Sequence, residues 1–288
     1  MHVGIAYSRI RKDEKALVGA LEDAGHDVTT VDVRDQQFGL TDPPAALVDV
    51  DLLVDRCLAT SRSRYVTRFA ESYGVPVVNS AATAAAGADK VETSLALSDA
   101  GVPTPETTVA FTPAAALEAI ESFGYPSVLK PVVGSWGRLM AKVESRSAAE
   151  AILEHKDTLG HYEHSVFYVQ EFVDKPGRDV RVLAADGDPV AAMVRSADHW
   201  LTNAARGADT APFELDGEAE AIVAAASEAI GGGLLGVDLM ETDDGYLCHE
   251  VNPTVEFAAL DETVDVDVPA AIVDWLETVA AERSEVAA

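Results

Sequence analysis

The sequence has few cysteines, few basic residues and no long apolar run. Its only two cysteines, Cys57 and Cys248, lie far apart in the 288-residue chain and form no C-x-x-C pair. This spacing gives no signature of a zinc site or a redox dithiol, so two buried, reduced thiols are expected. No apolar stretch approaches the roughly 18 residues of a membrane-spanning helix. The first residues lack the basic-then-apolar order of a signal peptide, and we expect a cytoplasmic protein without membrane contact.

The shortage of basic residues leaves a strongly acidic chain. Lys and Arg total 21 against 49 Asp and Glu, which gives a formal net charge of −28. This balance argues against nucleic-acid binding, because the phosphate backbone attracts Lys and Arg. A charge of this size repels itself in dilute buffer, whereas molar salt shortens the Debye length to about 3 Å. We interpret the composition as adaptation to a high-salt cytoplasm; the alternative is an acidic face for a basic partner.

Strands that alternate with helices dominate the first 85 residues. Such alternation predicts a parallel sheet with helices on both faces. The expected strands cover 2–7, 28–33, 51–55 and 75–79, and the expected helices begin at Asp13 and Ser61. We therefore place an N-terminal α/β domain at residues 1–85.

The remainder of the chain predicts a linking helix and two mixed α and β units. The helix lies within residues 86–103 and is followed by Val102-Pro103-Thr104-Pro105, which disfavours further helix. A compact unit is expected over 104–170 and a larger α+β unit over 171–288. The predicted fold class is thus α/β combined with α+β.

Two strand patterns near the C-terminus, GVDLM and GYLCHEVN, carry the first candidate site. Because side chains alternate along a strand, Cys248, Glu250 and Asn252 are expected on one face. Asp238 on the other strand points away from its apolar neighbours, so Asp238, Glu250 and Asn252 could converge. Three oxygen ligands of this kind suit Mg²⁺. The alternative is a pair of amphipathic strands with carboxylates in water.

A lysine and a small-residue loop form the second candidate site. Lys130 ends an expected strand, and backbone N–H groups in such loops can bind phosphate oxygens beside a lysine charge. The loop residues are Gly134, Ser135, Trp136, Gly137 and Arg138. The pattern is not a Walker A loop, and a turn with a surface lysine is the simpler alternative.

Four arginines cluster in a chain that has few of them. Arg178, Arg181, Arg195 and Arg206 surround the segment that contains Asn203. Arginine binds carboxylates and phosphates through two parallel hydrogen bonds. Ion pairs that balance local acids are the alternative interpretation.

In their order along the chain, these segments resemble the ATP-grasp superfamily. The order is a nucleotide-type sheet domain, Lys90 on the linking helix, a lid with Lys130 and its loop, the hinge QEFV, Asp238, and the E-x-N of Glu250 and Asn252. More narrowly, the chain is similar to the amino-group carrier protein ligases of the LysX/ArgX type, which are relatives of the RimK ligases. The segments that carry this resemblance are SRIRKDEK, DRCLATSRS, PVVNS, KPVVGSWGRLMAK, FYVQEFVDKPGRDVR and DHWLTNAARGA.

The resemblance implies an ATP-grasp fold with an N-terminal parallel α/β domain, a central lid subdomain and a C-terminal α+β domain. It also implies an ADP-forming ligase that joins the amino group of glutamate or α-aminoadipate to the C-terminal glutamate of a small acidic carrier protein. A RimK-like ligase that adds glutamate to a ribosomal protein tail or a small cofactor is the first alternative. A nucleotide-binding regulator without turnover is the second. Relatives are commonly oligomeric, so a homo-oligomer is expected.

The resemblance assigns roles to individual residues. ATP phosphates would be held by Lys90, Lys130 and the loop of residues 134–138. The adenine would be flanked by Glu171, Phe172 and Val173, and the rest of the nucleotide site would include Asp179 and Arg181. Mg²⁺, with two ions expected, would be held by Asp238, Glu250 and Asn252. The amino acid and the transition-state charge are assigned to Arg195, Asn203 and Arg206, and the acidic carrier to Arg9 and Arg11.

The loop after Asn252 departs from the family pattern. The core of Thr254, Glu256 and Phe257 is kept, and Thr254 and Glu256 are expected at the amino acid substrate. The Lys-Asn pair expected next is replaced by Ala258-Ala259. This change leaves the length of the substrate open. We expect glutamate, and hence arginine synthesis, because a high-salt organism of this kind is expected to use the carrier route for arginine.

Overall fold

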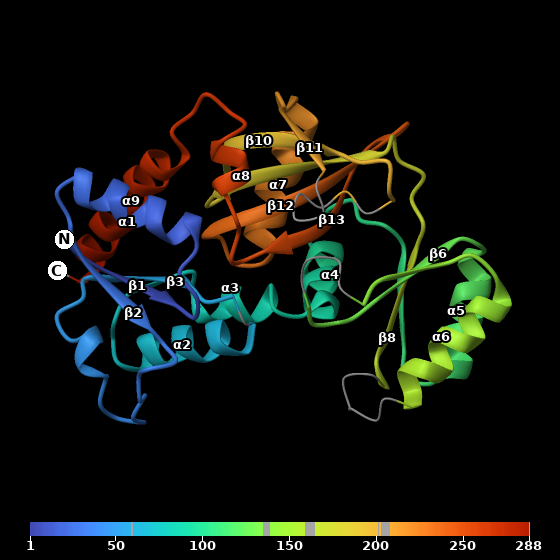
Figure 1. The fold of residues 1–288 in the computed structure, drawn as a ribbon, viewed down its shortest axis with the longest axis horizontal. Coiled ribbons are helices and arrows are strands. Elements are labelled where there is room, and N and C mark those ends of the chain that lie inside the picture. The colour runs from blue at the N-terminus through green and yellow to red at the C-terminus, as the bar shows by residue number, and fades with distance from the viewer. Residues whose placement is uncertain (59, 135–138, 159–164, 201, 203–207, 288) are drawn as a thin grey trace.

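The computed structural model describes residues 1–287 except 59, 135–138, 159–164, 201 and 203–207. The described chain folds into three sheets with helices packed against them (Figure 1). The N-terminal sheet is parallel, and the other two sheets are antiparallel. No helix among the described residues is long and apolar enough to cross a membrane.

The first sheet has the order β2-β1-β3-β4 and is covered on both faces, as its alternating pattern predicts. The helices α1 and α9 pack on one face through Leu17, Leu21 and Leu276, and α2 packs on the other through Val66 and Ala70. The strands are β1 (His2–Tyr7), β2 (Asp27–Asp32), β3 (Leu52–Arg56) and β4 (Val77–Val78). The helices are α1 (Lys12–Asp23), α2 (Thr60–Ser72), α9 (Val268–Ala287) and the 3-10 turn η1 (Ala45–Leu47).

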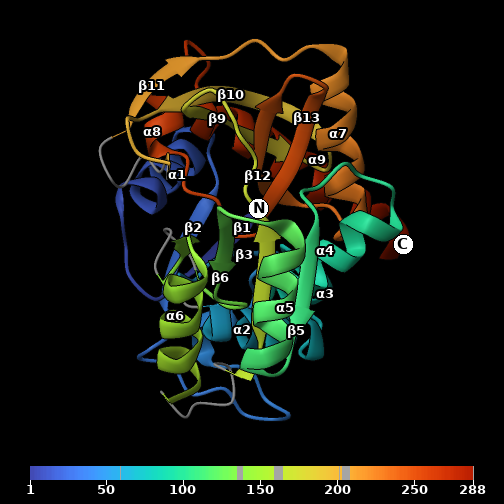
Figure 2. The ribbon, with the colours of Figure 1, turned by 90° about the vertical axis from the view of Figure 1, so that its right-hand side faces the viewer.

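Two short helices connect this sheet to the second one. They are α3 (Ala81–Ala86) and α4 (Lys90–Asp99), and Ser80 and Asp89 cap their N-termini through side-chain oxygens. The second sheet, in the order β5-β8-β6-β7, consists of β5 (Thr107–Ala110), β6 (Ser127–Lys130), β7 (Ala141–Val143) and β8 (Phe167–Glu171). Figure 2 shows α5 (Pro113–Phe123) and α6 (Arg146–Thr158) side by side against it.

The third sheet carries the C-terminal half of the chain in the order β11-β10-β9-β12-β13. Its strands are β9 (Arg178–Ala185), β10 (Asp188–Ser196), β11 (Asp209–Pro212), β12 (Leu234–Thr242) and β13 (Gly245–Asn252). The helix α7 (Gly217–Ala229) packs on one face, with Ile222 and Val223 against Val182 and Leu235. On the other side, Leu183 and Leu234 join the core that includes α1, α9 and α8 (Ala258–Asp261).

Four elements of this architecture escape the sequence patterns. The helices α3 and α8, the turn η1 and the strand β11 are each six residues or shorter. The strand β7 begins only at Ala141, because Leu139 has a left-handed backbone (φ 59°). Short segments give too few repeats for a periodicity to be recognised.

Candidate functional site

Two cavities meet where the three sheets approach one another. The larger, about 400 Å³, is lined by the carboxyl end of the first sheet, by α4 and by β13. The smaller, about 230 Å³, lies between the second and third sheets. They share Lys90, Gly134, Gln170, His249 and Glu250. A ligand in one cavity would therefore lie next to a ligand in the other.

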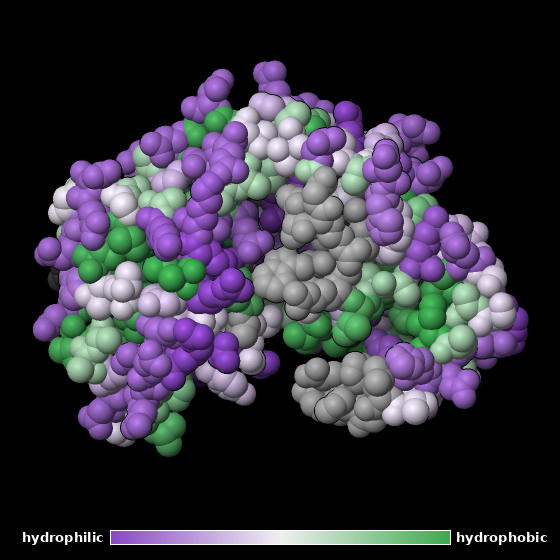
Figure 3. All heavy atoms as spheres, viewed as in Figure 1, coloured by the Kyte–Doolittle hydropathy of each residue, from purple (hydrophilic) through white to green (hydrophobic). Residues whose placement is uncertain are grey.

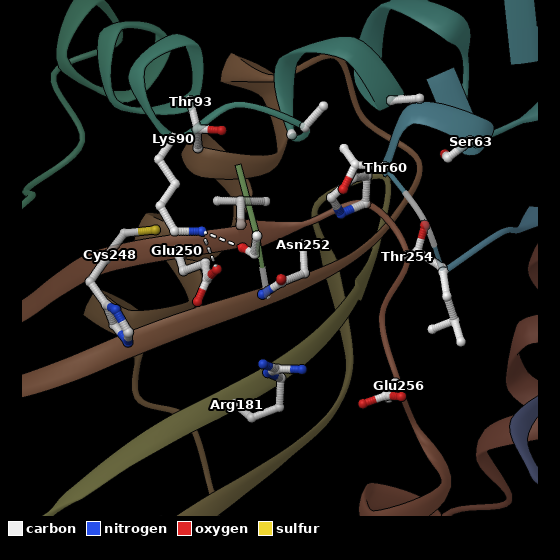
Figure 4. Close-up of a pocket in the computed structure, with 18 of the residues that line it drawn as sticks. Thr60, Ser63, Lys90, Thr93, Arg181, Cys248, Glu250, Asn252, Thr254 and Glu256 are labelled. Atoms are coloured by element: carbon white, nitrogen blue, oxygen red, sulfur yellow. Dashed lines mark hydrogen bonds and ion pairs between the residues drawn. The ribbon is translucent and has the colours of Figure 1, made fainter. Parts of the chain in front are cut away.

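The strand β13 lines the larger cavity and pairs with β12 behind it in the sheet. Asp238 pairs in register with Glu250, and Gly236 pairs with Asn252, so the two acids and the amide share one face of the sheet. This convergence is the one predicted from the sequence. Figure 4 shows Glu250 and Asn252 side by side on β13, with Arg181 on β9, which pairs with the far side of β12.

A β-bulge at His249 overturns one part of that prediction. Glu250 pairs with Asp238 while Cys248 pairs with the next residue, Leu239, so His249 has no partner across the ladder. The alternation of side chains is shifted by one residue at this point. Cys248 therefore packs with Leu239 and Val251 in the apolar core instead of sharing a face with Glu250. Burial raises the pKa of the Cys248 thiol to about 12, which makes it chemically inert.

Asp238 is buried among cations. Arg181 binds both of its carboxylate oxygens, and Arg195 Nη2 lies 3.0 Å from Oδ1. Burial opposes ionisation, but the two guanidinium groups outweigh it and hold the pKa of Asp238 well below its usual range. The carboxylate is therefore ionised at any working pH.

Arg195 is less available than its predicted role requires. The side chain lines the larger cavity but is only 4% exposed, and its Nε lies 2.7 Å from Asp179 Oδ1. Asp179 also accepts hydrogen bonds from Thr202. The local ion pairs considered as an alternative for these arginines are thus present. A direct contact of Arg195 with a substrate stays a prediction.

Lys90 joins three parts of the site. Its Nζ donates to Glu250 Oε1 at 2.9 Å and to the Gly134 carbonyl at 3.0 Å, and its backbone N–H donates to the Val132 carbonyl at 2.9 Å. The linking helix, the loop after β6 and the acidic strand β13 therefore meet at one ammonium group. Burial disfavours the Glu250 carboxylate, but Lys90 lowers its pKa below the ordinary value.

Lys130 ends β6 inside the smaller cavity. It is buried, and its Nζ donates to Gln170 Oε1 at 2.6 Å; Gln170 in turn donates to Thr107 Oγ1 at 2.9 Å. Burial lowers the pKa of Lys130 to about 8. The alternative of a surface lysine is therefore wrong: among the described residues Lys130 is a buried cation with the neutral Gln170 as its partner and with capacity for an anionic ligand.

The smaller cavity has the character of a site for a flat aromatic ring. Val128, Met140 and Met240 supply apolar walls, and the hinge residues Glu171, Phe172 and Val173 line one edge as predicted. The Lys142 ammonium lies 4.4 Å from the Phe172 ring centroid. The two methionines and His249 were not predicted, because they form no local motif: Met140 precedes β7, Met240 lies on β12 and His249 lies on β13.

The segment after Asn252 lines the other end of the larger cavity. Thr254 and Glu256 both face it, as expected of substrate residues. Arg11 Nη1 donates to Glu256 Oε1 at 2.7 Å, and the same guanidinium binds the buried Glu14. Arg11 therefore points into the molecule, and of the two predicted carrier contacts only Arg9 is exposed.

Several predicted site residues lie outside the described part of the chain. These are Ser135, Trp136, Gly137, Arg138, Asn203 and Arg206. Their assignments stay predictions. The neighbouring Gly134 is described, and its carbonyl faces Lys90.

Glu250 and Asn252 line the larger cavity and, with Asp238 beside them in the sheet, present oxygen atoms that suit a magnesium ion. Among the described residues no three His, Cys, Asp or Glu side chains form a metal cluster, so the Asn252 amide would be the third donor. Its Nδ2 donates to Asp238 Oδ2 at 3.5 Å, so the amide lies beside that carboxylate. Mg²⁺ binds one or two carboxylates and takes its other oxygens from water and phosphate. Asp238, Glu250 and Asn252 match that donor set.

Comparison with known proteins places this arrangement in a family. The LysX preATP-grasp domain matches residues 3–86, and the RimK-like ATP-grasp domain matches residues 87–276. The chain belongs to the RimK-like ATP-grasp family. The prediction of an ATP-grasp ligase is thereby confirmed.

Named ligases and a solved structure are similar to this chain over most of their length. An α-aminoadipate–LysW ligase LysX of Saccharolobus solfataricus is 34% identical, covering 86% of this chain and 90% of the relative. A glutamate–LysW ligase ArgX of Sulfolobus acidocaldarius is 28% identical, covering 96% and 98%. The crystal structure of a RimK domain ATP-grasp protein from Sphaerobacter thermophilus is 31% identical, with a TM-score of 0.82 over 96% of this chain and 99% of that one.

Proposed function

We propose that the protein is an ATP-dependent ligase that joins an amino acid to the C-terminal glutamate of a small acidic amino-group carrier protein. The observation that carries this proposal is the junction at Lys90 and Glu250, where a cavity suited to a nucleotide opens onto a cavity with convergent oxygen donors. The names of the LysX and ArgX relatives support a carrier protein as the partner. The amino acid is glutamate, α-aminoadipate or both.

ATP would occupy the smaller cavity with its phosphates toward the larger one. The adenine would lie between the methionine walls and the hinge of Glu171, Phe172 and Val173. Lys130 and Lys90 stand at the end nearest Glu250, where they would neutralise phosphate oxygens. Asp179 and Arg181 are also assigned to this part of the site. Asp179 accepts a hydrogen bond from Arg195, and Arg181 donates to Asp238.

Asp238, Glu250 and Asn252 would hold Mg²⁺ at the phosphates. The ion, when bound, neutralises the charge of the triphosphate beside a reacting carboxylate. Lys90, Arg181 and Arg195 form ion pairs with these acidic side chains, which favours their ionised form.

The reaction has two steps, the formation of an acyl phosphate and then the formation of the amide. A carboxylate oxygen of the carrier's C-terminal glutamate attacks the γ-phosphorus, and ADP leaves with the electron pair of the broken P–O bond. The amine of the amino acid then attacks the carbonyl carbon of the acyl phosphate. Phosphate leaves, the nitrogen loses a proton, and an amide remains. Two anions must meet in the first step, so cations that neutralise them supply most of the catalysis.

The amino acid would bind at the end of the larger cavity that Thr254 and Glu256 line. The Glu256 carboxylate, oriented by Arg11, would attract the ammonium group of the substrate. Arg195, Asn203 and Arg206 are proposed for the substrate carboxylates and the developing charge. The absence of the Lys-Asn pair after Phe257 leaves the far end of the cavity to Ala258 and Ala259.

The test is ADP release in molar KCl with ATP, Mg²⁺ and the carrier protein, with glutamate compared against α-aminoadipate. Turnover that requires the carrier supports the proposal, and the preferred amino acid identifies the biosynthetic pathway. Turnover without the carrier but with a small cofactor would overturn it. That outcome has a precedent in the family, since a tetrahydromethanopterin:α-L-glutamate ligase of Methanococcus maripaludis is 32% identical, covering 72% of this chain and 70% of the relative.

A further inference from the structure

The negative charge of the protein is unevenly distributed along the chain. Residues 1–85 contain 9 Lys and Arg against 12 Asp and Glu, a net charge of −3. The remaining residues contain 12 against 37, a net charge of −25. The first sheet and its helices are thus nearly neutral within a strongly acidic molecule. An acidic macromolecule would be repelled least by this part of the surface.

Three of the nine cations of this part lie at the carboxyl end of the first sheet. Arg9 follows β1, and Arg62 and Arg64 lie in the first two turns of α2, which follows β3. All three side chains are exposed. None of them forms an ion pair with a carboxylate of the described residues. Exposed, unpaired arginines are conspicuous in a chain with more than twice as many acids as bases.

The same residues lie at the wall of the larger cavity. Thr60 and Ser63, from the first turn of α2, line that cavity and appear on its N-terminal wall in Figure 4. The loops after β1 and β3 are joined, because the Leu58 N–H donates to Ser8 Oγ at 3.3 Å. Arg9 and α2 therefore lie beside the same cavity. Arg62 and Arg64, which flank the cavity residue Ser63 in the sequence, have exposed side chains.

An aromatic side chain completes this border. Tyr65 is 65% exposed and follows Arg64 directly on α2. Tyrosine and arginine are the residues most enriched at the energetic centres of protein interfaces. Because its side chain is exposed and lies next to arginines on α2, Tyr65 has no evident role in the packing of the fold.

We propose that Arg9, Arg62, Arg64 and Tyr65, here called the arginine rim, form the docking surface for an acidic protein whose C-terminal carboxylate enters the larger cavity. This inference rests on the proposed function and names the surface that would bind the carrier. A globular acidic protein fits better than a nucleic acid, because a long polyanion would extend from the rim onto the acidic remainder of the molecule. A protein can confine its contact to the rim.

Molar salt does not remove this kind of recognition. Screening suppresses attraction between charges separated by more than a Debye length, about 3 Å at 1 M. A guanidinium in direct contact with a carboxylate keeps its two parallel hydrogen bonds, and the tyrosine ring contributes by excluding water. The rim should therefore affect the stability of the complex more than the rate of encounter.

The test compares two charge-reversed variants under the turnover conditions given above. The first is Arg62→Glu combined with Arg64→Glu. The matched control is Lys15→Glu, an exposed cation on α1 that lines the groove against α9 and not the cavity. We expect the rim variant to raise KM for the carrier by about tenfold or more while KM for ATP and the amino acid stays unchanged. The control should change none of the three.

Three further results keep this inference separable from the proposed function. If the unmodified enzyme shows no carrier-dependent turnover, the proposed function fails and the rim loses its partner with it. If the enzyme turns over but the rim variant and Lys15→Glu have the same KM for the carrier, the rim alone is overturned. If the charge-reversed variant unfolds, Arg62→Gln with Arg64→Gln and Tyr65→Ala must each weaken direct binding of the carrier, measured calorimetrically; unchanged affinity overturns the rim.

Discussion

At the scale of single residues, the two carboxylates of the proposed metal site have different electrostatic surroundings. The Asp238 side chain is 2% exposed and neutralises two buried guanidinium groups. The Glu250 side chain is 29% exposed and has Lys90 as its partner. Removing the charge of Asp238 leaves Arg181 and Arg195 without their carboxylate partner in a poorly hydrated environment. Removing the charge of Glu250 leaves only the partly exposed Lys90 without its carboxylate partner. The two acids should therefore be separable by their effects on folding.

Asp238→Asn should abolish ligation and also destabilise the metal-free protein by about 3 kcal/mol, because breaking a buried ion pair leaves its partners uncompensated. The measurement is denaturant unfolding without Mg²⁺, together with ADP release. Nucleotide binding should survive, because the lysines at the phosphates are unchanged. An unfolding free energy equal to that of the unmodified protein would contradict the buried charge network.

Glu250→Gln should lower ligation by about two orders of magnitude or more, since a metal ligand and its charge are lost. Its unfolding free energy should change by less than about 1 kcal/mol, because the lost pair is partly exposed. Circular dichroism and ADP release test the two expectations on the same sample. A folded variant with full activity would rule out Glu250 as a ligand of the metal.

Lys130 should make ATP use sensitive to alkaline pH. Burial lowers its pKa to about 8, so the free enzyme holds the charged form below pH 8 and loses it above. The value of kcat/KM for ATP should accordingly fall as pH rises through about 8. In Lys130→Arg the guanidinium stays charged, and the decline should disappear. A pH profile that is the same for both proteins would assign the decline to another group.

The sequence predicted the acidic constellation because the alternation of side chains along a strand is a local property. To predict that Asp238, Glu250 and Asn252 converge, it was enough to recognise two strands that pair with each other. The shift at His249 was not predictable, because a bulge depends on how β13 meets β12 and not on a local motif. The contact between Lys90 and Glu250 joins residues 160 positions apart, and only the family resemblance indicated it.

At the scale of elements, the loop between β13 and α8 depends on the first sheet. Asp13 Oδ1, at the start of α1, accepts hydrogen bonds from the backbone N–H groups of Phe257 at 2.6 Å and Ala258 at 3.0 Å. Asn79, at the end of β4, donates to the Pro253 carbonyl at 2.7 Å. The substrate end of the larger cavity is therefore fixed by residues more than 150 positions away. Sequence patterns predicted α1 and β4, but not that they hold this loop.

Asp13→Ala should loosen that loop. Two backbone donors lose a charged acceptor, at a cost of about 2 kcal/mol, and KM for the amino acid should rise while KM for ATP stays constant. The control is Asp216→Ala, which removes the N-cap of α7 at about 1 kcal/mol and lies away from the loop. Thermal unfolding and steady-state kinetics compare them. If both variants change KM for the amino acid equally, Asp13 acts only on stability.

At the scale of the whole molecule, the acidic surface should make stability depend on salt. Hydrophilic side chains cover much of the face in Figure 3, and the net charge is −28. Self-repulsion of the folded chain weakens as the Debye length shortens toward about 3 Å at 1 M salt. The melting temperature should therefore rise steeply with KCl up to molar concentration. A melting temperature that is the same in dilute and molar KCl would contradict adaptation to high salt.

Salt can raise stability by screening charge repulsion or by general salting-out, and the two mechanisms predict different results when acidic side chains are removed. Glu214→Gln, Glu220→Gln and Asp265→Asn together remove three exposed charges that form no ion pair with described residues. If repulsion dominates, this triple variant should be more stable than the unmodified protein in dilute KCl and should gain less from added salt, so that the two melting curves converge near 1 M. If the salt instead acts because it is excluded from the protein surface and so strengthens apolar burial, the melting temperatures of both proteins rise equally, since their cores are identical. Parallel curves would assign the salt effect to the core and leave the acidic surface without a role in stability.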